Sequence, residues 1–285
     1  MKDGERPSIL ISHSLTTAAM EYELLDRYEH HILSCDERAF HSPFEDDELI
    51  IDNAEASGRA LRLVYAPFEH VNVRARIAIV GLTPGARQAS DALLALRAAL
   101  LAGAGRERAL AMAKSHASFS GPMRSNLVRM LDAVGVAAWL GVGSTAELWG
   151  DSNHLVQFTS TIPYPLAIDG ANWSGQPDVL GNGAIRGWFK RYGTTQFAQL
   201  RDAIIVPLGP AVTRAMLHLA SAGVVDPARV LVGLPHPSGA NAERIACFLG
   251  TKPAELASAR TDAAALLRAR ESLARQVASI AQPAS

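Results

Sequence analysis

The sequence predicts an α/β fold: a three-layer α/β/α sandwich around a central, mostly parallel sheet of four strands. Short apolar segments alternate with helical patterns over residues 61–250. These segments are rich in β-branched residues and are apolar on both faces, as the strands of a buried parallel sheet are. The 285 residues are 48% hydrophobic and 19% charged, so the chain can bury a large core and is not of a disordered composition.

The chain divides into three predicted parts. Residues 1–60 are polar and are expected to form a helical extension that contains the acidic loop SPFEDDELIIDN. Residues 61–250 make up the α/β domain. Residues 251–285 are rich in Ala, with Leu and Val at helical spacing, and predict a closing helix that packs on the same domain.

The strands and helices of the α/β domain follow from the apolar segments and the breaks between them. Four strands are expected, at Ile77–Gly81, Leu155–Thr161, Ala203–Leu208 and Val230–Leu234. Helices are expected to begin near Arg87, Met123, Ile185, Pro210 and Gly239. Ligands of an open α/β sheet bind at the carboxyl ends of its strands. The turn at residues 81–85 lies at such an end and is a candidate binding loop.

Composition and charge exclude several classes of protein. The net charge is −1, so any binding to DNA must come from a local basic patch. No segment reaches about 18 consecutive apolar residues, and the polar N-terminus MKDGERPSIL is unlike a secretory leader. We therefore expect a cytoplasmic monomer without membrane association. The two cysteines, Cys35 and Cys247, are too few for a four-cysteine metal site or an iron–sulfur cluster, and we expect no metal and no cofactor.

The turn GLTPG joins a strand to a helix with two glycines and a proline. Such a junction brings the backbone close to a ligand. It lacks the G-x-G-x-x-G pattern of dinucleotide-binding folds and the Gly-Lys-Ser/Thr sequence of a phosphate-binding loop. A plain strand-to-helix connection is the alternative interpretation.

A second stretch, GLPHPSGANAERIACFL, runs from Gly233 to Leu249. His236 lies between two prolines, at the end of an expected strand and just before an expected helix. Because the first turn of a helix has unpaired N–H groups, this junction can bind a phosphate. Ser238 can cap the helix or donate to a phosphate oxygen. The stretch therefore combines a conformationally restricted histidine with an anion-binding helix start.

Together, these two stretches resemble the uracil-DNA glycosylase superfamily. GLTPG is similar to its first motif, G-x-x-P-G or G-Q-D-P-Y, and PHPSGAN is similar to its last, H-P-S or N-P-S. FSGPMRSNLVRML and AIIVPLGPAVTRAML resemble core segments of its thermophilic-type branch. The four stretches occur in the order of the family, between residues 77 and 249. The resemblance implies a glycosylase-like α/β fold, DNA as the partner, and excision of a base that is flipped out of the duplex.

The resemblance implies a role for each matching residue. His236 matches the donor that stabilises negative charge on the departing base, and Phe119 matches the aromatic residue that stacks on that base. The base pocket would also include Gly81, Leu82 and Ser160. The phosphates of DNA would be held by residues at the two helix starts: Pro84, Gly85, Ser238, Gly239 and Asn241.

The sequence also departs from the family at two places in the site. Leu82 and Thr83 stand where the first motif normally has an acidic or amide group, and Thr83 can orient a water by a hydrogen bond but cannot act as a base at neutral pH. Ser160 stands where an asparagine reads uracil, and one hydroxyl cannot provide the paired donor and acceptor of an amide. Asp169 and Asp178 are candidates for the missing carboxylate, with ordinary turn chemistry as the alternative. The cluster-binding cysteines of the thermophilic-type branch are absent from the sequence.

The loop after Ser160 is rich in Gly, Asn, Trp and Asp and leaves a strand at its carboxyl end. Trp173 is expected to line the pocket or to stack on an additional group such as a sugar. A segment follows in which Arg186, Lys190 and Arg191 are interleaved with Trp188, Phe189 and Tyr192. This pattern suits contact with DNA. The alternative is an amphipathic surface helix with its aromatic side chains in the core.

We therefore expect a monofunctional DNA glycosylase that hydrolyses the N-glycosidic bond of a modified or non-standard pyrimidine and leaves an abasic site. Loss of the asparagine side chain at Ser160 leaves space for a substituent, so the leading candidate is a bulky hydroxymethylcytosine-type phage base, with a role in anti-phage defence. None of the four lysines lies in a family motif, which argues against Schiff-base chemistry. The alternatives are uracil excision in base excision repair and a degenerate protein that binds DNA or a nucleotide without catalysis.

Overall fold

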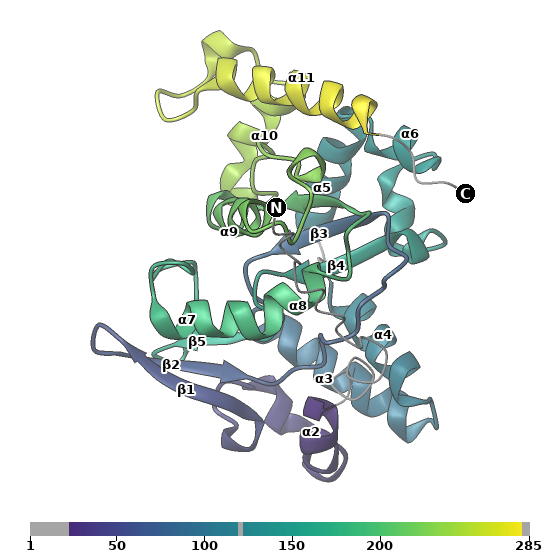
Figure 1. Ribbon diagram of the computed structural model, residues 1–285, viewed down its shortest axis with the longest axis vertical. Coiled ribbons are helices and arrows are strands. Elements are labelled where there is room, and N and C mark those ends of the chain that lie inside the picture. Colours follow the sequence, from purple (N-terminus) through teal and green to yellow (C-terminus); the bar gives the residue numbers. More distant parts are fainter. Residues whose placement is uncertain (1–22, 119–121, 281–285) are drawn as a thin grey trace, which may run out of the picture.

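The computed structural model describes residues 23–118 and 122–280 and has an α/β fold with two β-sheets (Figure 1). The α/β class is therefore as the sequence predicts. The parallel sheet lies near the middle of the molecule, and the second sheet lies toward one end, beside α2 (Glu23–Ser34). No helix within the two described ranges is long and apolar enough to cross a membrane.

The central strand of the parallel sheet is β3 (Ile77–Gly81). It pairs in parallel with β4 (Val156–Ser160) on one side and with β7 (Ile204–Pro207) on the other. All three strands coincide with strands that the sequence predicts. Gly81 is paired with Ser160, so the carboxyl ends of neighbouring strands meet at one edge of the sheet.

The fourth predicted strand is reduced to one parallel bridge, between Val230 and Ile205. The sequence VLVGLPHP explains why the ladder stops there. Gly233 has a φ of 121°, and Pro235 and Pro237 have no N–H to donate to a neighbouring strand. A four-stranded parallel sheet is therefore not confirmed: the parallel sheet has three strands in the described part of the chain.

The second sheet is antiparallel and is not predicted from the sequence. Its strands are β1 (Ile50–Ala56), β2 (Arg59–Val64), β5 (Leu166–Ile168) and β6 (Ala171–Asn172), in that order across the sheet. Ser57 and Gly58 both have positive φ and form the tight turn of the β1–β2 hairpin. This hairpin crosses the boundary predicted at residue 60, and β1 occupies part of the predicted acidic loop. The region before residue 60 is therefore not helical throughout.

Five helices begin close to their predicted starts. These are α3 (Ala86–Leu101), α5 (Pro122–Ala133), α7 (Gly183–Trp188), α9 (Pro210–Ser221) and α10 (Ala242–Leu249). A short 3₁₀ turn, Gly239–Asn241, precedes α10, and the closing helix is α11 (Ala263–Ser279). The structure also contains α4 (Arg106–Ala117), α6 (Val136–Leu140) and α8 (Thr194–Phe197).

Helices cover both faces of the parallel sheet. Alternate side chains of a strand point to opposite faces. On one face, Ala78, Val80 and Ile205 belong to a core that includes apolar residues of α3 and α9. On the other face, Ile77 and Ile79 belong to a core that includes apolar residues of α5, α10 and α11. Burial on both sides is the reason why these strands are continuous apolar runs in the sequence.

The chain after α7 crosses the end of β4 at very short range. Helix α7 continues through a π-helical turn, Phe189–Gly193, into α8. A side-chain carbon at Gly193 would lie 2.2 Å from the carbonyl oxygen of Thr161 and 2.8 Å from the ring of Phe189. A carbon atom does not approach a backbone oxygen so closely, so only glycine fits at this crossing.

We expect Gly193→Ala to lower the free energy of unfolding by about 1–3 kcal/mol, because the added carbon overpacks the crossing. Gly187→Ala is the matched control, since Gly187 is an exposed position of α7 with no atom within 4 Å of an added carbon. The control should be unchanged or more stable, by up to about 1 kcal/mol. Urea unfolding measures both variants, and equal midpoints would contradict the close crossing.

Candidate functional site

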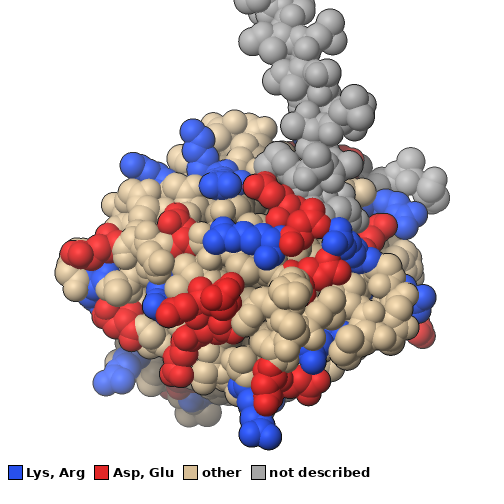
Figure 2. Space-filling view, turned by 90° about the horizontal axis from the view of Figure 1, so that it is seen from below, with Lys and Arg blue, Asp and Glu red and all other residues tan. Residues whose placement is uncertain are grey.

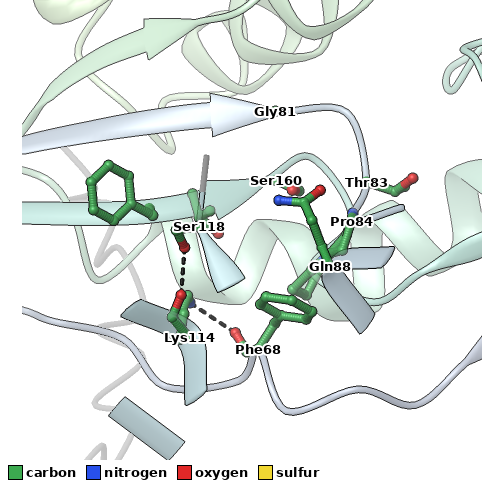
Figure 3. A pocket seen from close by; sticks show the side chains of 11 residues that line it. Phe68, Gly81, Thr83, Pro84, Gln88, Lys114, Ser118 and Ser160 are labelled. Carbon is green, nitrogen blue, oxygen red and sulfur yellow. Dashed lines mark hydrogen bonds between the residues drawn. The ribbon is translucent and has the colours of Figure 1, made fainter. Parts of the chain in front are cut away.

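A small pocket opens at the carboxyl ends of β3 and β4 (Figure 3). Four of the predicted site residues line it: Gly81, Thr83, Pro84 and Ser160. The other lining residues are Phe68, Gln88, Lys114, Ser118, Phe158, Thr159 and Pro163. The cavity measures about 40 Å³, which is room for a few water molecules, since about 10–15 Å³ of such space holds one. A pyrimidine ring therefore enters only when lining side chains move.

A buried amide holds the end of β4. Ser160 is 9% exposed, and its carbonyl oxygen accepts a hydrogen bond of 3.0 Å from Nε2 of Gln196. Oε1 of the same amide accepts a 2.5 Å hydrogen bond from the hydroxyl of Thr159. Gln196 lies in α8 and belongs to no motif, so the sequence contains no signal for its role. Because the Gln196 amide is hydrogen-bonded to the carbonyl oxygen of Ser160, the side-chain hydroxyl is the polar group that Ser160 offers to the pocket.

The glycine-rich turn has fewer free N–H groups than the sequence suggests. The N–H of Gly85 donates to Oε1 of Gln88 at 3.2 Å, and the N–H of Ala86 donates to Oδ1 of Asn172 at 2.8 Å. Pro84 has no N–H to offer. Side chains thus already occupy the first donors of α3, and this geometry does not favour Pro84 and Gly85 as phosphate-binding residues.

The pocket also contains a buried lysine. Lys114, in α4, is 4% exposed, and its amino group donates to the carbonyl oxygens of Phe68 at 2.8 Å and His70 at 2.5 Å. Burial lowers the pKa of Lys114 to about 7. Burial also raises the pKa of Glu69 to about 7, and Glu69 accepts a 2.8 Å hydrogen bond from the hydroxyl of Tyr65. Sequence reasoning missed this lysine because its two acceptors lie 46 and 44 positions away.

A second, larger cavity of about 540 Å³ contains His236. Nδ1 of the ring accepts a 3.3 Å hydrogen bond from the N–H of Ser238, so the neutral ring carries its proton on Nε2. Burial lowers the pKa of His236 from 6.5. Nδ2 of Asn126, in α5, donates to the carbonyl oxygen of Pro237 at 3.0 Å and anchors the loop. The result is a neutral histidine with a free hydrogen-bond donor.

Polar and basic residues surround His236. Three of them line the same cavity: Arg214, Arg244 and Asn241. Nδ2 of Asn241 donates to the hydroxyl of Ser238 at 3.1 Å, across the short turn that contains Gly239. Of the residues predicted to bind phosphate, Ser238, Gly239 and Asn241 therefore lie beside His236. The two arginines of the cavity place positive charge next to them.

The two cavities lie at the same edge of the parallel sheet. The first is at the ends of β3 and β4, and the second is at the end of β7, where Gly209 and Pro210 follow the strand. Neighbouring strands are about 4.8 Å apart, so about 10 Å separates the ends of β4 and β7. A nucleotide spans such a distance. The fold thus brings motif residues that are distant in the sequence to one edge.

Two residues predicted to contact the base pack elsewhere. The side chain of Leu82 lies 3.3 Å from the position that a carbon would take at Gly175, so it packs against the following loop. Trp173 is 3% exposed, and its indole N–H donates to the carbonyl oxygen of Pro177 at 3.1 Å. The structure corrects the expectation that Trp173 lines the pocket or stacks on a sugar, because the loop folds back and buries the ring in the core.

The carboxylates considered as replacements for the missing acidic group are ion-paired. Asp178 pairs with Arg214 at 2.6 Å and accepts the N–H of Leu180 at 2.9 Å. The hydrogen bond from Arg214, above all, holds the pKa of Asp178 below its usual range. Asp169 pairs in the same way with Arg59 at 2.7 Å. Both residues stabilise turns, and the low pKa makes Asp178 a weak base rather than a catalytic one.

The basic and aromatic segment of α7 and the π-helical turn after it separates into two faces. Trp188 and Phe189 are buried, and the indole N–H of Trp188 donates to Asp52 at 2.8 Å. Tyr192 packs edge-on against Tyr164, with 5.1 Å between the ring centres. The three cations of the segment are exposed: Arg186, Lys190 and Arg191. The aromatic rings therefore belong to the core, which is the alternative interpretation, and only the cations remain available to DNA.

The face formed by α2, β1 and β2 carries charges of both signs (Figure 2). Ion pairs near it join Arg106 to Asp26 at 2.6 Å and Arg62 to Asp47 at 2.9 Å. Because acidic and basic side chains are mixed there, this face does not present a surface of one sign to DNA.

Phe119, the predicted stacking aromatic residue, lies outside the described residues. Its neighbour Ser118 lines the first pocket and donates from its hydroxyl to the carbonyl oxygen of Lys114 at 2.5 Å. Within residues 23–118 and 122–280, no three His, Cys, Asp or Glu side chains form a group that could hold a metal ion.

Comparison with known proteins relates the chain to one bacterial protein. Over 198 residues it is 34% identical to the uncharacterized protein YoxB of Bacillus subtilis (strain 168), and the match covers 67% of this chain and 76% of YoxB. The chain belongs to the YoxB family. No family model matches the chain, and no solved structure matches it. Since YoxB is itself uncharacterized, membership of the YoxB family does not name a reaction.

In this member of the YoxB family, we expect Lys114 to make stability rise between pH 7 and pH 9. The unfolded chain keeps the lysine proton up to about pH 10, whereas the folded chain loses it at about pH 7. The unfolded state therefore binds more protons in this range, and the free energy of unfolding increases with pH. The slope is at most about 1.4 kcal/mol per pH unit. Urea unfolding at pH 7, 8 and 9 measures it.

Lys114→Met removes the titrating group and should abolish the rise. Lys190→Met is the matched control, because Lys190 is exposed and its loss should leave the slope unchanged. A slope that survives in Lys114→Met would assign the rise to another group.

Proposed function

We propose that this protein is a monofunctional DNA glycosylase of the uracil-DNA glycosylase superfamily. It hydrolyses the N-glycosidic bond of a modified or non-standard pyrimidine that is flipped out of DNA, with water as the nucleophile, and leaves an abasic site. The observation that carries the proposal is a neutral His236, protonated on Nε2, at the sheet edge that also holds Thr83 and Ser160. The order of the four sequence motifs supports it.

The proposal includes the fold of that superfamily, a four-stranded sheet between two layers of helices. Helices on both faces of the sheet support this part of the proposal. The bridge between Val230 and Ile205 also supports it, because it lies where a fourth strand would extend the order β4-β3-β7. His236 then follows the end of that fourth strand.

Cleavage leaves negative charge on the base and positive charge on the sugar. A donor aimed at the base oxygen stabilises the negative charge as it develops. The imidazole of His236 suits this task, because its lowered pKa keeps it neutral at pH 7 and Nε2–H is its free donor. One such preorganised donor lowers the barrier by about 3 kcal/mol.

A hydroxyl would orient the attacking water. Thr83 lines the first pocket, and none of the described residues that line it is an Asp or a Glu. A threonine hydroxyl does not accept a proton at neutral pH. The bond to the base must therefore break largely before water attacks. The sugar cation is then captured by a water that Thr83 holds, and the proton that this water loses passes to the departing base anion.

Local cations would bind the DNA backbone. Arg244 is exposed in the first turn of α10 and lines the cavity of His236 together with Asn241. Three further exposed cations lie on α7 and the turn after it: Arg186, Lys190 and Arg191. Because a net charge of −1 provides no general attraction to DNA, these groups would set the affinity for phosphates.

Uracil excision is a second candidate, and the size of the first pocket favours it. The side chain of Gln88 lines the pocket near Ser160, where the sequence suggests free space, and the cavity measures about 40 Å³. A bulky substituent therefore needs a larger rearrangement than a plain pyrimidine does. The size of the base that the protein releases thus distinguishes the two roles. Release of a bulky hydroxymethylcytosine-type base would favour defence against phage, and release of uracil would favour repair.

Base release from a panel of DNAs tests the proposal. Duplexes that contain uracil, hypoxanthine, hydroxymethylcytosine or glucosylated hydroxymethylcytosine are incubated with the protein, and free bases are detected by mass spectrometry. We expect release of one pyrimidine and an unbroken strand with an abasic site. DNA binding without release of any base would contradict an enzyme and favour the binding-only alternative.

In the same assay, His236→Ala should lower the turnover of that base by about a hundredfold or more, because the donor to the departing oxygen is lost. His218→Ala is the matched control, since His218 is exposed in the last turn of α9. Thermal unfolding of both variants checks that the fold is intact. A folded His236→Ala variant with full activity would show that His236 does not stabilise the departing base.

The pH profile of turnover should have its acid limb below pH 6.5. Burial lowers the pKa of His236, so the neutral form persists to a lower pH than in a free histidine. Activity is then lost only as the pH falls through this lowered pKa, because a proton on Nδ1 faces the N–H of Ser238 and displaces the ring from its position. His236→Gln keeps an N–H donor that does not titrate and should lack the limb. If the variant shows the same limb as the wild type, His236 is not its source.

A further inference from the structure

The carboxamide of Gln88 lies in the first pocket. Gln88 belongs to the first turn of α3 and lines the pocket together with the end of β4. Figure 3 shows its amide group pointing toward Ser160. No other carboxamide is found among the described residues that line this pocket.

Two hydrogen bonds set the direction of this amide. Oε1 accepts from the N–H of Gly85, and Nε2 donates to the carbonyl oxygen of Ala117, each over 3.2 Å. A flipped amide would place its NH₂ group against a donor and its oxygen against a carbonyl, so one orientation satisfies both partners. An amide accepts two hydrogen bonds and donates two. One donor and one acceptor site therefore remain for a ligand.

Most of the polar groups around Gln88 are engaged with the protein. The hydroxyl of Thr159 donates to Gln196, and the hydroxyl of Ser118 donates to the carbonyl oxygen of Lys114. The amino group of Lys114 donates to two backbone carbonyls. The hydroxyl of Ser160 rotates freely about its bond and does not impose a paired donor and acceptor. The amide of Gln88 is the lining group that offers both at once in a set direction.

We propose that Gln88 reads the base in this pocket, in place of a side chain at position 160. The Watson–Crick edge of a pyrimidine presents a donor next to an acceptor, and the remaining N–H and lone pair of the Gln88 amide complement that pair. The inference rests on the proposed function, since the ligand is the flipped pyrimidine. A small residue at position 160 makes room for an amide that comes from α3 instead of β4.

Gln88→Met tests this role, because it keeps the length of the side chain and removes both hydrogen-bonding groups. We expect kcat/KM for the preferred pyrimidine to fall by about ten- to a hundredfold, as two hydrogen bonds are lost. Binding to DNA that already contains an abasic site should be unchanged, because that DNA has no base to read. A fall in both quantities would point to a structural role and overturn the proposal.

Asn172→Ala is the matched control. Asn172 accepts the N–H of Ala86 at the same helix start, at 2.8 Å, but does not line the pocket. It should weaken the start of α3 as Gln88→Met does and leave kcat/KM unchanged. Equal losses of kcat/KM in the two variants would also overturn the reading role of Gln88.

A wild-type protein that releases no base would refute the proposed function, and binding alone then decides the role of Gln88. In ¹⁵N-labelled protein, the side-chain amide resonances of Gln88 are assigned by their absence from Gln88→Met. Addition of free uracil or free hydroxymethylcytosine should shift them. Gln88 resonances that stay in place while the backbone amide of Ser160 shifts would overturn the proposal, and so would the absence of any shift.

Discussion

The parallel pairing of β3 with β4 on one side and β7 on the other is the constraint on which the site depends. It brings the ends of strands from distant parts of the sequence to one edge, with Gly81 beside Ser160. Because both faces of the sheet are buried, a shift of register would move apolar side chains out of their packing. The ladder ends after Val230, where glycine and prolines follow, and the chain is then free to carry His236 over the sheet edge.

Side chains to which the sequence assigns no role hold this edge in place. The amide of Gln196 fixes the end of β4, Asn126 anchors the loop of His236, and Lys114 ties the pocket to the segment after β2. Buried polar groups are costly unless they are paired, so each of these side chains meets a backbone partner. Environment also decides which titratable groups are free to react. Burial lowers the pKa of His236 and keeps its ring neutral. Asp178, in contrast, accepts a hydrogen bond from Arg214, which keeps this carboxylate charged and engaged in an ion pair.

Local sequence patterns were sufficient for much of the fold. The strand Ile77–Gly81 and the helix that begins at Pro210 depend on residues within a few positions of each other: an apolar run in one case, a glycine and a proline in the other. The same is true of His236, whose ring accepts from the N–H only two positions away. Apolar periodicity and turn chemistry are local properties, and the sequence by itself determined the α/β class, three central strands and the restricted histidine.

Only the tertiary structure decided which side chains face a cavity and which face the core. Trp173 is buried in the core and not in the pocket, and the buried Trp188 reaches Asp52 across 136 positions. The antiparallel sheet pairs β2, which precedes β3, with β5, which follows β4, so no local sequence pattern predicts it. Gln88 and Lys114 enter the pocket because α3 and α4 pack beside the ends of β3 and β4. The physical reason is that burial and hydrogen-bond pairing belong to the packed chain, and a residue acquires them only from partners that folding brings to it.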